Sequence, residues 1–458
     1  MIGKNPHYFI NYTFHIDLLF LFCYHISDSI PNNKTNKGAF HVKKLKKTLV
    51  ATTAVATTLA LIAGCGTSGS SNTSNTSGPS GTGSATPASN EITVGTLYAS
   101  SGAYATSSMP EYAGLKLWVD QVNAAGGVQV KATGKKEKIK LIAYNDQSSV
   151  STATNLYNQL ITQNKVNILV SDFGSVLTSV AVPIAQENKM LLFDPTGSGA
   201  TFFTPNNPYI VLTALPTSQI WPDSLAQYLT NHGIKHPAIL YCENDFDQSQ
   251  NTTLMQKLQA AGITPVYDNG VATSTSNYSV LVHDIAAKNP DMVMELGYPN
   301  NDIAFLQALQ STGTKFNKTF VIFPGQLPAL FEKDFPISQL SGLYTYPTPP
   351  FINYKNVNYG LTLPNFESQY KSSTGQTANF LSVAGYTTGL IVQKTLETST
   401  SLSQQDLRAA VNQFSGTIVT LDGPFKVDST TGAQLGETLP VGQLVSNGKG
   451  GLGVNILK

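Results

Sequence analysis

The chain has few charged residues and almost no arginine. Of its 458 residues 12% are charged, and 28 Lys and Arg nearly balance 27 Asp and Glu, for a net charge of +1. Soluble proteins carry about 25% charged residues. The balance gives no reason to expect nucleic acid or an anionic membrane surface as a partner. The single arginine, Arg408, excludes a guanidinium cluster that grips phosphate or carboxylate.

The scarcity of charge suggests adaptation to acidic surroundings, where carboxylates lose their charge. This hypothesis predicts that the folded chain is most stable below neutral pH.

Cysteine is also scarce. The chain has three, Cys23, Cys65 and Cys242, and only Cys242 lies in the part of the sequence with a globular pattern. No internal disulfide is therefore expected there. Cys242 follows the apolar run AILY without a basic neighbour, which indicates a buried, inert thiol rather than a nucleophile.

The longest apolar run near the N-terminus ends at Cys65. HVKKLKK (residues 41–47) is basic, and residues 48–63 are uncharged and rich in Ala and Thr. This is typical of a secretory signal, because a membrane span needs about 20 strongly apolar residues. The ending Ile-Ala-Gly-Cys resembles the lipobox of bacterial lipoproteins, in which the cysteine receives diacylglycerol. Lipidation at Cys65 is favoured over an uncleaved anchor with an incidental cysteine.

Two further segments flank this signal. Residues 1–41 contain an apolar patch interrupted by His15, Asp17 and His25, which argues against a second membrane segment. We interpret them as an over-extended gene product, with the true start at Val42 and the signal peptide at 42–64. Residues 65–90 consist of Cys65 and a Ser/Gly/Thr-rich stretch that predicts a flexible linker.

Beyond residue 90, short β-like runs alternate with helical patterns. The runs are EITVGTLY, KIKLIAYND, VNILVSDFG, MLLFDP, AILYCEND, DMVMELGY and KTFVIFPG, and most are followed by an amphipathic stretch. Such alternation predicts an α/β fold in which parallel sheets are flanked by helices. Helix ends are expected at Gly126, Gly262 and Gly313, because glycine readily adopts the left-handed conformation of a C-cap.

The length beyond residue 90 suggests two lobes. We expect the first to comprise residues 91–214 and 350–418 and the second residues 215–349 and 419–458. Crossings between them are predicted at Tyr209–Pro222, Ser341–Tyr354 and Thr417–Gly423, the last within a hairpin whose turn residues are Ser429–Gly432.

Loops after the predicted strands are rich in hydroxyl groups, glycine and aromatic residues. In an open parallel sheet, ligands bind beyond the carboxyl ends of the strands. These loops offer N–H and O–H donors to a small acceptor such as a carboxylate, aided by helix N-termini. Helix capping by Ser and Thr explains any one of them, but the set favours a binding site. The loops are Tyr98–Ser108, Asp172–Ser179, Asp194–Thr201, Glu243–Ser249, Gly297–Asp302 and Pro324–Gln326.

Four stretches carry a family resemblance. AGLKLWVDQVNAAGGV, AYNDQSSVSTATN, FGSVLTSVAVPIAQENKMLLFDPTGS and DGPFKVDSTTG occur in the order found in branched-chain amino-acid-binding proteins. These are the type I solute-binding lipoproteins of ABC importers. The resemblance covers most of residues 91–458, and it implies two Rossmann-like lobes, joined by three hinge crossings, that close on a small solute.

The resemblance also implies roles for individual residues. Ser175 matches the serine that holds the ligand carboxylate, and Thr196 and Ser198 match the loop on its other side. Phe246 and Tyr298 match aromatic positions that close over the ligand, although core packing is an alternative for both. Tyr104 is a looser candidate for the wall of the side-chain pocket.

One departure from the family pattern concerns the ligand. Amino-acid binders of this family place an acidic residue after the strand corresponding to KTFVIFPG, where this chain has Gly325 and Gln326. A buried ammonium without a carboxylate is costly. Either Glu243, Asp245 or Glu295 replaces the acid, or the ligand carries no ammonium; Gln326 would suit an amide, a hydroxylated ligand or an organic acid.

Sequence motifs typical of enzymes and of metal sites are incomplete in this chain. GKGGLG (residues 448–453) fits GxGxxG but lies at the C-terminus without a following helix. Asp245-Phe246-Asp247 begins like a calcium loop without its Gly and closing Glu, and His232 and His236 flank Gly233, where a helix face is not expected. We expect no catalysis, no cofactor and no metal.

The expected function is capture of a small amino-acid-like, amide or organic-acid solute and its delivery to ABC transporter permease subunits. The protein would be an extracytoplasmic monomer, attached by lipid to the outer face of the cell membrane, without a nucleic-acid partner. The alternative is a ligand-sensing receptor of the same fold that acts with a signalling partner, and a third reading is a lipid-anchored hydrolase using an unrecognised serine.

Overall fold

A computed structural model describes residues 91–436 and 438–457. The segments interpreted above as a leader (1–41), a signal peptide (42–64) and a linker (65–90) lie outside these residues, and so does Cys65. Among the described residues, no helix has the length and apolar character needed to cross a lipid bilayer.

A six-stranded sheet organises the first lobe. Its order is β2-β3-β1-β4-β5-β6, and all neighbours are parallel except β2 and β3. The strands are β1 (Glu91–Tyr98), β2 (Val128–Val130), β3 (Lys135–Asn145), β4 (Ile168–Val170), β5 (Leu192–Asp194) and β6 (Ile210–Leu212). Parallel order arises because a helix connects most consecutive strands.

Helices cover both faces of this sheet. Ile92 and Val94 of β1 lie in one apolar core with α1, α10, α11 and α12, whereas Leu97 lies in a second core with α2 and α3. Successive side chains of a strand point to opposite faces, so one strand serves both cores. The helices are α1 (Ala105–Ala124), α2 (Val150–Thr162), α3 (Gly174–Glu187), α10 (Leu363–Thr374), α11 (Phe380–Thr398) and α12 (Gln404–Phe414), with the short η1 (Ala200–Phe202).

A seven-stranded sheet organises the second lobe. Its order is β15-β14-β11-β10-β9-β7-β8, with β14 antiparallel to both of its neighbours and the other pairs parallel. The strands are β7 (Pro237–Cys242), β8 (Tyr267–Val271), β9 (Met292–Leu296), β10 (Thr319–Val321), β11 (Tyr344–Thr345), β14 (Gly442–Ser446) and β15 (Leu452–Ile456). All five residues of β9 are buried, as expected for a central strand covered on both faces.

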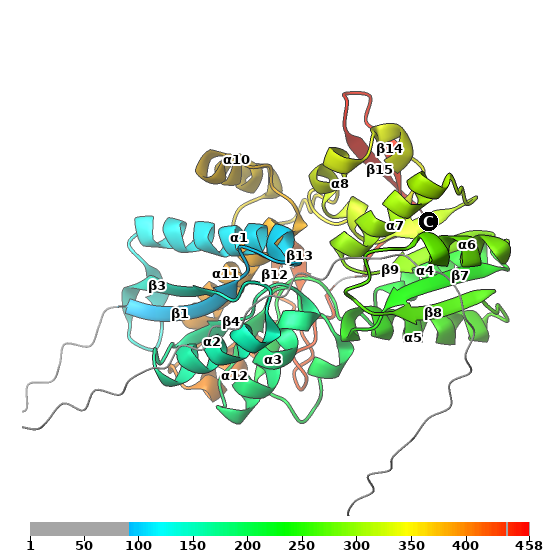
Figure 1. Ribbon diagram of the computed structural model, residues 1–458. Helices are drawn as coiled ribbons and strands as arrows, with labels where there is room; N and C mark the ends of the chain where they lie inside the picture. Colours follow the sequence, from blue (N-terminus) through cyan, green and yellow to red (C-terminus); the bar gives the residue numbers. More distant parts are fainter. Residues whose placement is uncertain (1–90, 437, 458) are drawn as a thin grey trace, which may run out of the picture. The chain divides into compact units, whose positions relative to one another are not determined.

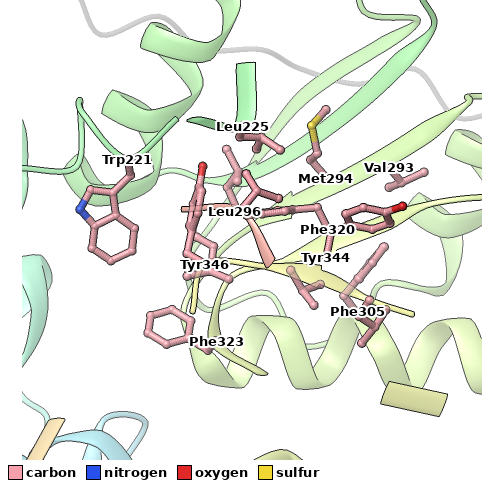
Figure 2. Close-up of a cluster of buried hydrophobic side chains, with 14 of the residues drawn as sticks. Trp221, Leu225, Val293, Met294, Leu296, Phe305, Phe320, Phe323, Tyr344 and Tyr346 are labelled. Carbon is pink, nitrogen blue, oxygen red and sulfur yellow. The ribbon is translucent and has the colours of Figure 1, made fainter. Parts of the chain in front are cut away.

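The helices of the second lobe form two packed pairs, α4 with α5 and α6 with α7. The sheet lies between α5 and α7 (Figure 1). The helices are α4 (Pro222–Asn231), α5 (Asp245–Ala260), α6 (Ser279–Ala287), α7 (Pro299–Thr312), α8 (Pro328–Asp334) and α9 (Ile337–Leu340), with η2 (Phe323–Gly325). Figure 2 shows the aromatic and aliphatic side chains of this core, among them Trp221, Phe320 and Tyr346.

The predicted α/β architecture is confirmed, and the predicted C-terminal hairpin is present with a different turn. Strands β12 (Ile418–Thr420) and β13 (Gly423–Phe425) pair around Leu421 and Asp422, and Ser429–Gly432 form a second turn beside an isolated bridge from Val427 to Gln434. Leu421 and Phe425 pack in the core of the first lobe. Residues 417–423, expected to be the third crossing, thus lie within the first lobe, and the chain enters the second core at Leu439.

Candidate functional site

The strand-end loops of the first lobe meet through hydroxyl groups. Gly174 N donates to Thr196 Oγ1 at 3.0 Å, and Gly199 N donates to Ser175 Oγ at 2.9 Å. Both bonds join the loop after β4 to the loop after β5. Ser198 is also buried in the second of these loops, and its Oγ has no hydrogen-bond partner among the described residues. The structure therefore brings Ser175, Thr196 and Ser198 together.

Buried carboxyl groups accept hydrogen bonds from these loops. Asp172 Oδ1 accepts from Phe173 N at 2.7 Å and from Ser108 Oγ at 2.5 Å. Asp194 Oδ1 accepts from Gly197 N at 2.7 Å. These bonds order the backbone immediately before Ser175 and before Ser198.

Burial disfavours the ionised form of each of these acids. Burial raises the pKa of Asp194 to about 6, and burial with the neighbouring Asp146 raises the pKa of Asp172. Burial also raises the pKa of Glu111 well above its usual range, against the opposing effect of Thr196 Oγ1, which donates to Glu111 Oε2 at 2.6 Å. Sequence reasoning missed these acids, because nothing in their spacing showed that they converge.

An aromatic cluster of the second lobe faces these loops. Phe246, in the first turn of α5, stacks on Tyr298 with ring centroids 5.6 Å apart, and Phe246 also contacts Trp221 edge-on at 4.9 Å. Tyr298 is the residue at which α7 is capped. Both rings are buried and belong to the apolar core of the second lobe, as the alternative of core packing predicts.

Tyr298 reaches across to the first lobe. Its ring lies 5.7 Å from that of Tyr104 and 5.7 Å from that of Phe173, and its hydroxyl accepts from Val176 N at 3.4 Å. A Cβ at Gly174, whose φ is +75°, would lie 3.2 Å from the Tyr298 ring and hydroxyl. The Tyr298 hydroxyl of the second lobe thus lies at the N-terminus of α3 in the first lobe. This position favours an electron-rich oxygen.

Gln326 lies at the end of η2 beside the N-terminus of α11. Its side chain is fully buried, and neither Nε2 nor Oε1 has a hydrogen-bond partner within the described part of the chain. Its backbone oxygen accepts from Phe380 N of the first lobe at 3.4 Å. An unpaired buried amide costs about 1–3 kcal/mol. Gln326 therefore carries unused donor and acceptor capacity where the two lobes adjoin.

The three acids considered as ammonium partners have different surroundings. Glu243 is exposed, and Asp245 accepts from Thr201 N and Oγ1 of the first lobe at 3.0 and 2.7 Å. Glu295 is fully buried, and burial with the neighbouring Asp302 raises its pKa well above its usual range.

Asp247 is an acid that sequence reasoning missed. It is fully buried, and burial raises its pKa well above the usual range. Burial raises the pKa of Tyr298 and of Tyr104, and the neighbouring Asp247 raises both further. Asn244 donates to Asp247 Oδ2 at 2.7 Å, whereas Oδ1 has no partner among the described residues. In the sequence, Asp247 looks like an ordinary acidic residue in the first turn of a helix.

A cavity lies elsewhere, at the opposite end of the strands of the second lobe. It has a volume of about 530 Å³ and is lined by the C-terminal end of α7 and by residues 335, 338–343. None of the predicted site residues lines it. At the predicted site, the aromatic rings of Tyr104, Phe173 and Tyr298 lie in contact instead.

Features considered for catalysis have structural roles. Burial raises the pKa of the Cys242 thiol, and the neighbouring Asp247 raises it further, as expected for an inert cysteine. His232 stacks on Tyr228, and GKGGLG forms the turn between β14 and β15. Within residues 91–436 and 438–457, no group of three His, Cys, Asp or Glu side chains is arranged to hold a metal ion.

Comparison with known proteins places this geometry in context. The profile of a family described as periplasmic binding protein matches residues 91–449. Two curated relatives, both from Brucella, are Leu/Ile/Val-binding protein homologue 8 of B. abortus, 27% identical over 242 residues, and homologue 7 of B. melitensis, 26% identical over 246 residues. Each match covers 50% of this chain, and it spans 57% and 58% of the relatives, respectively.

Solved structures share the fold. A branched-chain amino acid transporter substrate-binding protein from Streptococcus pneumoniae, in complex with isoleucine, superimposes with a TM-score of 0.66 at 16% identity. A solute-binding protein of an ABC transporter from R. palustris, in complex with 4-hydroxybenzoate, gives 0.69 at 18% identity. The matches cover 80% of this chain and 99% and 96% of those chains.

Proposed function

Because this chain belongs to the periplasmic binding protein family, we propose that it captures a small solute between its two lobes and delivers it to the permease of an ABC importer. The observation that carries this proposal is the contact of Tyr298 with the N-terminus of α3. This contact joins strand-end loops of both sheets. Open parallel α/β folds bind their ligands beyond the carboxyl ends of the strands, where these loops lie.

We infer that the ligand presents an electron-rich oxygen, such as a carboxylate, to the N-terminus of α3. There it would take the place of the Tyr298 hydroxyl and accept from backbone amides and from Ser175 and Ser198. The helix N-terminus favours negative charge, and the unpaired Oγ of Ser198 is an available donor. The rings of Phe246, Tyr298 and Tyr104 would then cover the apolar part of the ligand.

The opposite end of the ligand would meet Gln326. Its unpaired amide supplies one acceptor and two donors, which suit a hydroxyl, an amide or a second carboxyl group. Ammonium is disfavoured, since this chain has Gln326 where amino-acid binders have an acid, and burial raises the pKa of Asp247 and of Glu295 and so disfavours their charged forms. We therefore propose an organic acid or an amide as the ligand.

A lipid anchor would keep the protein close to the permease. We propose that Cys65 carries lipid and that residues 66–90 tether the lobes to the outer face of the cell membrane. The support is the sequence pattern around Cys65, a basic cluster, a short apolar run and small residues before the cysteine. Mass analysis of the protein isolated from its cell would show a diacylglyceryl-modified Cys65 at the N-terminus, and an unmodified cysteine would refute the anchor.

A thermal-shift screen tests the ligand proposal. The chain would be heated with amino acids, amides, aromatic acids and short aliphatic acids, since a solute that binds the folded form raises the melting temperature by mass action. We expect shifts with acids or amides. A shift confined to leucine, isoleucine or valine would reject the proposed ligand class but retain solute capture. Chemical conversion of any solute would show that the protein is an enzyme, and it would reject the proposal of capture alone.

A further inference from the structure

The β2–β3 hairpin of the first lobe concentrates positive charge. Five lysines, Lys131, Lys135, Lys136, Lys138 and Lys140, lie within ten residues, and all five are exposed. The one acid among them, Glu137, is buried. We call these five residues the basic hairpin. In the described part of the chain none of them takes part in an ion pair.

The surrounding sequence makes this concentration distinctive. Residues 91–458 contain 21 Lys and Arg and 25 Asp and Glu, and burial raises the pKa of several of these acids, among them Asp172 and Glu295. The charge of the globular part is therefore close to balanced, and the basic hairpin concentrates positive charge at one end of the first lobe. Such asymmetry creates a local potential that a net charge near zero conceals.

Protection of a sheet edge accounts for only part of this concentration. Edge strands often carry lysine because it blocks pairing with another chain. Strand β3 pairs with β2 over residues 135–137 and with β1 over residues 138–145, so each part of it has a strand on one side only. Lys131 lies in the turn between β2 and β3, where edge protection does not apply. Along β3, Ile139 points into the core, and Lys138 and Lys140 on either side of it project to the surface.

The basic hairpin lies where the chain enters the globular region. Lys138 is the register partner of Glu91, the first residue of β1, and Figure 1 shows β1 and β3 side by side. The far end of β1 leads to the loop that carries Tyr104. A strand of eight residues is about 26 Å long. The lysines and the start of β1 are thus separated from the candidate ligand site by the length of the sheet.

We propose that the basic hairpin docks on the anionic phospholipid headgroups of the membrane to which the chain is tethered. This inference rests on the proposed anchoring at Cys65. The 25 uncharged residues from Gly66 to Asn90 have an expected end-to-end distance of roughly 25–30 Å, so the hairpin stays near the surface. Several lysines then act together within a Debye length of the headgroups.

Vesicle binding tests this proposal without the lipid anchor. The chain from residue 65 onward, which lacks the interpreted signal peptide, would carry the substitution Cys65→Ala. It would be sedimented at low ionic strength with vesicles of phosphatidylcholine alone and of phosphatidylcholine mixed with phosphatidylglycerol. A variant with all five hairpin lysines changed to Gln is compared with a control in which five exposed lysines of the second lobe are changed to Gln. The control positions are Lys235, Lys288, Lys315, Lys333 and Lys449.

We expect binding to the anionic vesicles only, with a loss of roughly tenfold or more in the hairpin variant and little change in the control. Rising salt should weaken the binding of the unsubstituted hairpin, which gives a readout independent of how well the variants fold. Equal loss in both variants, equal binding to neutral vesicles, or no binding at all would overturn the proposal. Failure of docking is distinguishable from failure of solute capture, because the ligand-induced melting shift should survive in the hairpin variant.

Discussion

At the scale of single residues, Gln326 offers the most direct test of the site. A buried amide with no partner destabilises the ligand-free protein, and its retention is explained if a ligand uses it. We expect Gln326→Met to raise the free energy of unfolding without ligand by about 1–2 kcal/mol. The same variant should lose the melting shift that the wild type shows with its ligand.

Urea unfolding and the thermal-shift screen measure the two effects separately. Gln326→Glu is the matched second variant, because it restores an acid where amino-acid binders of the family have one. It should destabilise the ligand-free protein at neutral pH through a buried charge. If Gln326→Met keeps full ligand binding, the amide does not contact the ligand.

Tyr298 also has two functions that substitution can separate. Its ring packs on Phe246, and its hydroxyl occupies the N-terminus of α3. We expect Tyr298→Phe to bind the ligand as well as the wild type or more tightly, because it removes the group that the ligand displaces. Tyr298→Ala should weaken binding by roughly tenfold through loss of the ring. Calorimetric titration measures both, and a loss of binding in Tyr298→Phe would show that the hydroxyl contacts the ligand directly.

At the scale of elements, the packing of α1 against α11 depends on glycine. A Cβ at Gly385 would lie 1.9 Å from the backbone oxygen of Glu111, closer than any real contact. We expect Gly385→Ala to push the two helices apart and to lower the free energy of unfolding by about 1–3 kcal/mol. Gly453→Ala is the control, since its nearest neighbours lie at 3.6 Å, an ordinary contact. Similar unfolding free energies for the two variants would contradict this account.

Prediction from the sequence was most successful for individual strands and helices. β9 is recognisable in DMVMELGY because a buried parallel strand is apolar on both faces, and α7 follows it as expected. The placement of β12 and β13 in the first lobe was not recognisable. Leu421 and Phe425 are apolar residues that suit either core, and only tertiary packing shows which one they join.

At the scale of the whole molecule, buried acids govern the dependence of stability on pH. Burial raises the pKa of Asp422 to about 7 and that of Asp194 to about 6, and it also raises those of Asp172, Glu295 and Asp302. The folded state therefore binds more protons than the unfolded state, whose aspartates titrate near 3.9. The resulting stability is fully present below about pH 4 and is lost as pH rises through the folded values.

We therefore expect the free energy of unfolding to be lower at pH 8 than at pH 5, by a few kcal/mol for each acid whose pKa lies near 7. Urea titrations at several pH values measure this directly. Asp422→Asn, which removes one raised pKa while preserving shape, should flatten the dependence. Stability that rises between pH 5 and pH 8 would reject both this account and the hypothesis of adaptation to acidic surroundings.

The sequence by itself determined the α/β class and the family of this protein, because alternating apolar runs, glycine at helix ends and ordered motifs are local features. Strand-end geometry pointed to the loops of the candidate site, since loops after parallel strands face one edge of a sheet, and the family resemblance implied Ser175, Thr196, Ser198 and Tyr298 within them. Only the tertiary structure decided that Tyr298 meets the N-terminus of α3 and that the buried Asp247 raises the pKa of Tyr298. It also showed that the lysines of β3 lie beside the start of β1. These relations join residues far apart in the chain, and they arise from packing rather than from local pattern.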